Sequence, residues 1–488
     1  MNPVVWKQCA LRLVIAPATM AILLVAAGCG SGSGIIKSLG GGFSKASLNG
    51  QFVITQTGIG VNQQSTASPF SETIVFKADG NGNLNVTVDD FDQAGGPFSN
   101  PAVTGTYSIS SDGTGSLLFN GSHYAITMID DSHFYVIQQD NFATASGFGE
   151  KQDTTAFSAA PSGTFVFKAH DVNTSSRVGR VSITNGAISG SEDLLNLGLL
   201  SSPKSIASTV SMNVPDANGR GTCVLDDGST FNYYVVNAGK FDFMSNSLSG
   251  SLEIGQAEGQ TGPFSFTTLA PGASFVFGSS GDTNLQAGIH SAGVFTSDGN
   301  GNITSGTLDF VQDASVNSNI LVSGGTYTLD TDGHGEIDLN SSVGTIRQIF
   351  LMVNGTRAVF LVNSAAAVED GTFSQQQGAP FSSLGNQAAF FMDGFDVTFK
   401  DRVGAFTPTK NGFSWKQSAN AFDDTIGVGT LTNTSTNGTA QVSSNGRVVV
   451  TVNGVTNNLV FYLSSPGTGF MVQEDADIGG AFTQQASQ

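Results

Sequence analysis

Internal repetition restricts the fold of this chain more than any other feature of its sequence. Segment 77–83, Lys-Ala-Asp-Gly-Asn-Gly-Asn, returns at 296–302 as Thr-Ser-Asp-Gly-Asn-Gly-Asn. Two further pairs follow in the same order: Gly105-Thr-Tyr107 with Gly325-Thr-Tyr327, and Asp112-Gly-Thr-Gly115 with Asp332-Gly-His-Gly335. Three motifs that recur in one order at an offset of 219 or 220 residues indicate a duplicated structural unit.

The material between these copies also repeats. Arg177-Val-Gly179 matches Arg402-Val-Gly404, and Phe-rich segments open four stretches of the chain, near Phe52, Phe165, Phe275 and Phe391. The order is therefore A-B-A-B. The predicted domains are a signal peptide (1–28), a Gly/Ser-rich tether (29–46), A1 (47–153), B1 (160–258), A2 (270–378) and B2 (384–486).

Each repeat has the pattern of a small antiparallel β-domain. Leu84, Val86 and Val88 alternate with polar residues, which puts one face of a strand on a core and the other in water. Asp-Gly and Asn-Gly pairs between such runs favour tight hairpin turns. About eight short strands per repeat predict an all-β chain of four tandem antiparallel meander β-barrels, because closure removes exposed strand edges. The alternative is a series of β-sandwiches.

The N-terminus is typical of a secretory signal. Lys7 and Arg12 precede an apolar run, 13–27, that is too short for a spanning helix and is interrupted by Pro17. The run ends in Ala26-Ala27-Gly28-Cys29, which resembles the lipobox of bacterial lipoproteins, although Ala26 stands where Leu is usual. The resemblance implies cleavage before Cys29, a diacylglycerol on its sulfur and an acyl chain on its amine. An ordinary secretory signal is the alternative.

The residues after Cys29 agree with a membrane anchor. A Gly/Ser-rich stretch would separate a folded body from the membrane surface. Gly30 is not the Asp that retains such lipoproteins at the inner membrane, so the resemblance favours the outer membrane. Cys9 leaves with the signal and Cys29 is lipidated, so Cys223 alone remains and no disulfide is expected within one chain. Cys223 lies in a strand-like run and is predicted to be a core residue.

Composition and motifs predict no enzyme and no resident metal or cofactor. Acidic residues exceed basic ones by 38 to 19, which excludes a basic nucleic-acid surface. The loop 330–341 matches an EF-hand at Asp330 and Asp332. However, His334 is a poor ligand for a hard cation and Ser341 stands where a bidentate Glu is required, so a hairpin turn is the better interpretation. The acid pairs are interpreted as solvated turn or edge charges: Asp89-Asp90, Asp130-Asp131, Asp226-Asp227 and Asp423-Asp424.

These observations predict a non-catalytic protein of the cell envelope. The strand count resembles that of lipocalins and avidins in architecture only, and the whole chain resembles secreted bacterial repeat lipoproteins. We expect the repeated domains to support binding or adhesion, with a protein, glycan or small hydrophobic ligand as partner. One alternative is a carrier that holds a hydrophobic small molecule inside a barrel, although 36 Phe residues more commonly fill such interiors. A structural spacer is the other.

Overall fold

A computed structural model gives the fold. It describes residues 42–61, 67–93, 96–171, 175–196, 198–208, 210, 212–247, 252–283, 288–312, 315–364, 367–394, 398–409, 412–453, 459–473 and 477–486. The signal, Cys29 and most of the tether lie outside these ranges. Within the described ranges, no helical segment has the length and hydropathy that crossing a membrane requires.

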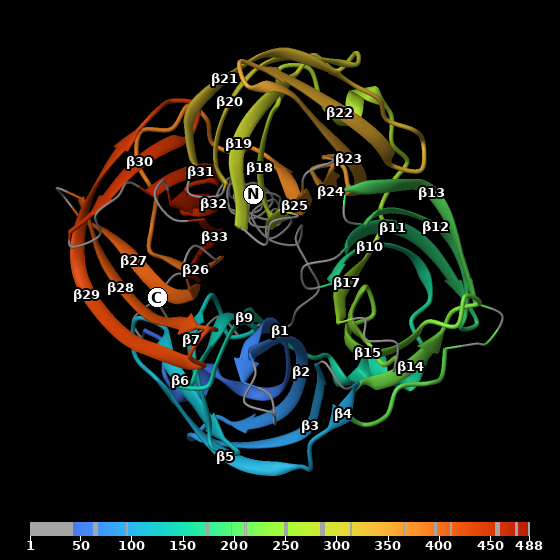
Figure 1. Ribbon diagram of the computed structural model, residues 1–488, viewed down its shortest axis with the longest axis vertical. Helices are drawn as coiled ribbons and strands as arrows, with labels where there is room; N and C mark the ends of the chain where they lie inside the picture. The colour runs from blue at the N-terminus through green and yellow to red at the C-terminus, as the bar shows by residue number, and fades with distance from the viewer. Residues whose placement is uncertain are drawn as a thin grey trace, which may run out of the picture. The chain divides into compact units, whose positions relative to one another are not determined.

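The described residues form four antiparallel β-units, named A1, B1, A2 and B2 in chain order (Figure 1). A1 comprises β1 (Asn49–Val61), β2 (Ala67–Asp79), β3 (Asn83–Gln93), β4 (Phe98–Ser99), β5 (Val103–Ile109), β6 (Thr114–Phe119), β7 (Ser122–Met128), β8 (His133–Gln139) and β9 (Ala143–Lys151). B1 comprises β10 (Gly163–Asp171), β11 (Ser175–Thr184), β12 (Ala187–Asn196), β13 (Leu199–Ser208), β14 (Arg220–Val224), β15 (Thr230–Asn237), β16 (Lys240–Ser245) and β17 (Glu253–Gly259).

The second pair of units repeats this order. A2 comprises β18 (Ser274–Thr283), β19 (Gly288–Ser297), β20 (Asn302–Gln312), β21 (Ser315–Tyr327), β22 (His334–Ser341), β23 (Gly344–Asn354), β24 (Arg357–Val362) and β25 (Ala367–Gln375). B2 comprises β26 (Ala388–Gly394), β27 (Phe399–Thr409), β28 (Gly412–Asp423), β29 (Val428–Val442), β30 (Arg447–Val452), β31 (Leu459–Ser465), β32 (Thr468–Gln473) and β33 (Ile478–Gln484). Short 3-10 helices precede A1, B1 and A2: η1 (Lys45–Ser47), η2 (Thr154–Ser158) and η3 (Phe266–Thr268).

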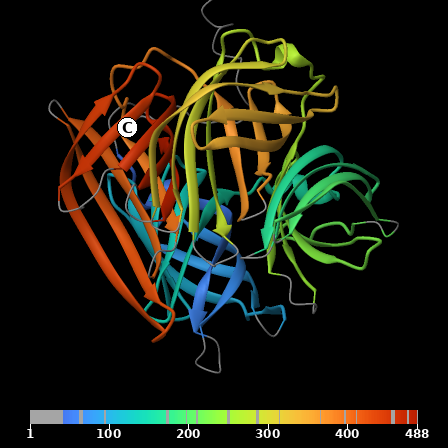
Figure 2. The same cartoon turned by 45° about the horizontal axis from the view of Figure 1, so that its top comes forward.

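Three units are closed barrels, as predicted, and the fourth is not. A2 and B2 close through pairing of their first and last strands, and A1 closes through β2 and β3. B1 is a curled sheet that stays open between β13 and β14 (Figure 2). Pro203 lies where the pairing of β13 with β12 shifts register, and β14 has only five residues. Because proline lacks a backbone N–H, this edge offers a poor template for a further ladder.

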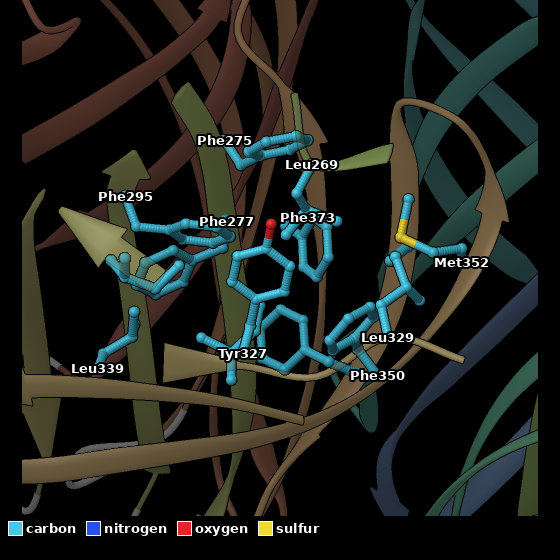
Figure 3. Packing of buried hydrophobic residues seen from close by; sticks show 14 of the residues in the cluster. Leu269, Phe275, Phe277, Phe295, Tyr327, Leu329, Leu339, Phe350, Met352 and Phe373 are labelled. Carbon is cyan, nitrogen blue, oxygen red and sulfur yellow. The ribbon is translucent and has the colours of Figure 1, made fainter. Parts of the chain in front are cut away.

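Aromatic and aliphatic side chains fill the interiors of the units. In A2 the core includes Phe275, Phe295, Phe350 and Phe373, and their rings point toward one another inside the barrel (Figure 3). In B2 the indole of Trp415 stacks on Phe390 at 4.1 Å and is buried. The Phe side chains at alternating, inward-facing strand positions therefore fill the interior of each small barrel.

The repeated Asp-Gly-Asn-Gly-Asn motifs are turns, as predicted. The Asp79 carboxylate accepts hydrogen bonds from the backbone of Asn81 (2.7 Å) and of Asn83 (3.0 Å) and from the Asn83 side chain. These bonds lower the pKa of Asp79 to about 2, the Asn83 side chain contributing most. Asp298 makes the same set of bonds. The carboxylates are thus used within their own loops.

A glutamine after the last strand of each unit binds the turn of the next unit, and we call this contact the clasp. Its amide Nε2 donates to two backbone carbonyls beside a glycine of positive φ. The last clasp connects B2 back to A1, so the contacts form a closed cycle. The four clasps join Gln152 to Asn218 and Val235, Gln260 to Asp332 and Met352, Gln376 to Asn445 and Leu463, and Gln485 to Asp112 and Met128, over 2.7–3.2 Å.

Substitution of the clasp glycine is expected to destabilise the contact between two units. Gly446 has φ +91°, and an added Cβ would lie 2.5 Å from the Gln376 amide nitrogen. Backbone strain and the displaced amide predict that Gly446→Ala costs about 2–3 kcal/mol. Gly355→Ala is the control, because a Cβ there meets open space. Equilibrium urea unfolding measures both, and equal midpoints for the two variants would contradict the clasp.

Candidate binding cavity between the four units

The units contact one another through apolar positions on their opening strands. Val53, Val166, Val276 and Ala389 lie between inward-facing core residues and point outward instead. Each is fully buried or nearly so in a cluster that it shares with a neighbouring unit. Val53 packs with Tyr234 of B1, for example, and Ala389 with Tyr135 of A1. Both faces of these strands are therefore buried.

A buried ion pair is repeated within each A-B pair. Asp90 of A1 accepts hydrogen bonds from Arg220, Tyr234 and Asn232 of B1. Asp309 of A2 accepts the equivalent bonds from Arg447 and Tyr462 of B2. The interpretation of Asp89-Asp90 as solvated charges was wrong: both side chains are buried, and Asp90 serves the interface. The sequence shows an acid pair but not the basic partner 130 residues away.

Inside the cycle lies a cavity of about 630 Å³. The first and last strands of every unit contribute to its walls. This volume is within the range of small-molecule sites, about 300–1,000 Å³. Its lining combines small residues, such as Gly278 and Gly281, with aromatic rings and with several charged side chains.

Three carboxylates from A2 and B2 form an acidic group on the wall of the cavity: Asp282, Asp393 and Asp401. Burial raises the pKa of Asp282 to about 6. Burial is also the main cause that raises the pKa of Asp393 to about 7, and repulsion from Asp401 and Asp282 raises it further. Burial also raises the pKa of Asp401 to about 7, although Thr144 of A1 donates a hydrogen bond to it. Carboxylates in these surroundings take up protons near neutral pH.

The ammonium that acts on Asp393 is already paired. Lys168 of B1 forms an ion pair with Asp370 of A2, which also accepts a hydrogen bond from Ser176. Although burial alone would raise it, the pKa of Asp370 lies below its usual value because Lys168 and His170 attract its charge. The pair is close to neutral overall, so the acidic group keeps an excess of negative charge.

His290 of A2 also lines the cavity. His290 is 2 % exposed and lies against Gly394 and Gly479, where any side chain would collide with its ring. Burial lowers its pKa to about 4, so the ring is neutral at pH 7. The ring is hydrogen bonded to the backbone of Asp477, whereas Nδ1 has no hydrogen-bond partner among the residues that the structure describes.

Charged residues of A1, B1 and A2 lie elsewhere around the cavity, and most of them are paired. Asp242 of B1 accepts hydrogen bonds from Thr55 and Gln256, and its pKa is raised to about 6 by burial and by Glu150. Lys240 pairs with Glu150 at 2.6 Å. Arg357 of A2 pairs with Glu258 of B1. Although burial alone would raise it, the pKa of Glu258 lies below its usual value because the Arg357 charge stabilises the carboxylate. This part of the cavity therefore carries three carboxylates, of Asp242, Glu150 and Glu258, against the two cations of Lys240 and Arg357.

The residues singled out in the sequence lie elsewhere. Cys29 is outside the described residues. Cys223 is a core residue of B1, as predicted, and burial raises the pKa of its thiol to about 11. In the loop 330–341, His334 contacts Asp193 of B1 at 3.0 Å. No three His, Cys, Asp or Glu side chains in the described ranges are grouped to hold a metal ion.

The barrel interiors offer little room for a ligand. The core side chains of A1, A2 and B2 are almost completely buried against one another. The open unit B1 has an apolar space of about 80 Å³ beside Cys223 and Met212. That is well below the volume that binds a drug-sized molecule.

Comparisons with known proteins place the chain near no established family. No family model matches it, and no curated protein matches it. A point mutant of transferrin binding protein B from Haemophilus parasuis Hp5 is 10% identical with a TM-score of 0.20, covering 67% of this chain and 76% of that one. Isotype 1 of that protein from serogroup B Neisseria meningitidis is 10% identical with a TM-score of 0.22, covering 62% and 66%. Scores this low carry no functional inference.

Proposed function

We propose that this chain is a lipid-anchored protein of the bacterial cell envelope that binds a small polar molecule without catalysis, in the cavity between its four units. The observation that carries the proposal is a cavity of about 630 Å³ to which every unit contributes polar side chains. A ligand there would contact A1, B1, A2 and B2 together. The alternative of a carrier that holds a hydrophobic molecule inside a barrel finds less support, because the interiors of A1, A2 and B2 are filled.

The anchor is proposed from the sequence. Cys29 follows Ala-Ala-Gly, and each buried methylene of an attached acyl chain adds about 0.8 kcal/mol to membrane binding. Gly30 favours the outer membrane over the inner membrane. The Gly/Ser-rich tether would hold the four units away from the lipid surface.

Loss of the anchor is expected to be almost complete in the variant Cys29→Ser. The full-length chain should move from the detergent phase to the aqueous phase in a Triton X-114 partition of bacterial membranes. Cys223→Ala is the control and should stay in the detergent phase, since Cys223 lies in the core of B1. Unchanged partition of Cys29→Ser would contradict lipidation.

Native mass spectrometry tests the binding function directly. The full-length protein is purified from bacterial membranes in mild detergent, and its native mass is compared with its denatured mass. We expect a reproducible excess mass that disappears on denaturation. Matching masses, together with no compound that raises the thermal midpoint in a metabolite screen, would overturn the proposal.

A further inference from the structure

Among the described residues, no ion pair joins Asp282, Asp393 or Asp401 to a basic side chain. Asp282 and Asp393 face the cavity, and the charges that act on Asp393 are two further carboxylates and Lys168. Lys168 is held by Asp370. Keeping these buried carboxyls charged near neutral pH is costly, and a bound cation in the cavity would offset that cost.

Two independent features point to an organic cation. The buried Nδ1 of His290 lacks a partner among the described residues, and with the ring bonded to the backbone of Asp477 it is left as an acceptor for an N–H donor. Aromatic rings line the same cavity: Phe391 of B2 packs on Tyr135 of A1, and Phe470 lies at another edge. Ring faces attract ammonium groups and cover the carbon chain between them.

We propose that the cavity binds a small organic polyamine whose ammonium groups contact Asp282, Asp393 and Asp401, with His290 Nδ1 accepting a further hydrogen bond. This inference rests on the proposed binding function and names its ligand class. A bare divalent cation fits less well, because the described residues offer no three-ligand metal group and a metal ion would leave most of 630 Å³ unfilled. The net charge of −19 would attract the same class of ligand.

Titration calorimetry with spermidine at pH 7.5 and low salt tests the proposal on the full-length protein in detergent. We expect saturable binding with one site per chain. The double variant Asp282→Asn/Asp393→Asn should weaken it at least about tenfold, because two charge-assisted contacts are lost. Glu336→Gln removes one charge from an exposed position on β22 and should change affinity less than about twofold.

Each other result has a defined meaning. Equal binding by the wild type, the double variant and Glu336→Gln would show attraction to the acidic surface only and would overturn the site. Binding of Mg²⁺ or Ca²⁺ alone, without spermidine binding, would overturn the amine. If native mass spectrometry finds a bound molecule without amino groups while spermidine fails to bind, the polyamine is wrong and the binding function stands. Circular dichroism and the thermal midpoint confirm that the double variant is folded.

Discussion

Asp309→Ala is expected to destabilise the contact between A2 and B2 by about 3–5 kcal/mol. Asp309 is 1 % exposed and accepts two hydrogen bonds from Arg447, at 2.6 and 2.8 Å, as well as one from Tyr462. Its removal leaves a largely buried guanidinium without its carboxylate, and breaking a buried pair from one side typically costs this much. The effect measures the loss of one partner and not the net contribution of the pair to stability.

The same unit supplies a matched control. Asp338 and Arg347 also form a two-bond ion pair, at 2.8 and 3.0 Å, but the arginine side chain is 47 % exposed. Asp338→Ala should therefore cost less than about 1 kcal/mol. Urea unfolding can be followed by the fluorescence of Trp415, which lies in the core of B2 beside Phe390. Equal shifts for Asp309→Ala and Asp338→Ala would show that burial does not govern this interface.

Strands and turns were predictable because their signals are local. Alternation at Leu84, Val86 and Val88 and the Asp-Gly-Asn-Gly-Asn motifs depend on neighbours within a few residues, and the all-β barrels and the turns were confirmed. The open edge of B1 was missed. Pro203 in the sequence indicates an edge strand at this position, since a central strand disfavours proline.

The cavity could not be predicted from local patterns, because it depends on how whole units meet. A partial signal existed in the opening strands. Phe52-Val-Ile, Phe165-Val-Phe and Phe275-Val-Phe are unbroken apolar runs, which indicate strands buried on both faces. Outward positions further along β18 and β26 turn acidic, at Asp282 and Asp393. Aligning the four repeats would have shown both features, but not that the two carboxylates face one cavity.

The acidic group also makes stability depend on pH in a definite direction. The folded pKa of Asp393 is about 7, against an ordinary value of 3.8, so the folded state favours the protonated carboxyl. Its contribution is most favourable below about pH 4 and is lost as the pH rises through 7. Asp282 and Asp401 act in the same sense, and Lys168 opposes them only partly because it is paired with Asp370.

Asp393→Asn is therefore expected to stabilise the ligand-free protein at pH 8 by roughly 2–3 kcal/mol and to change little at pH 4.5. At pH 8 the variant removes a charge that burial and its neighbours oppose, whereas at pH 4.5 the wild-type carboxyl is already neutral. Thermal midpoints at the two pH values measure the difference, with Glu336→Gln as the exposed control. Destabilisation of Asp393→Asn at pH 8 would mean that an unrecognised cationic group already neutralises the carboxylate. Stabilisation would mean that the Asp393 carboxylate lowers the stability of the ligand-free fold at pH 8, as expected for a charge that a ligand requires.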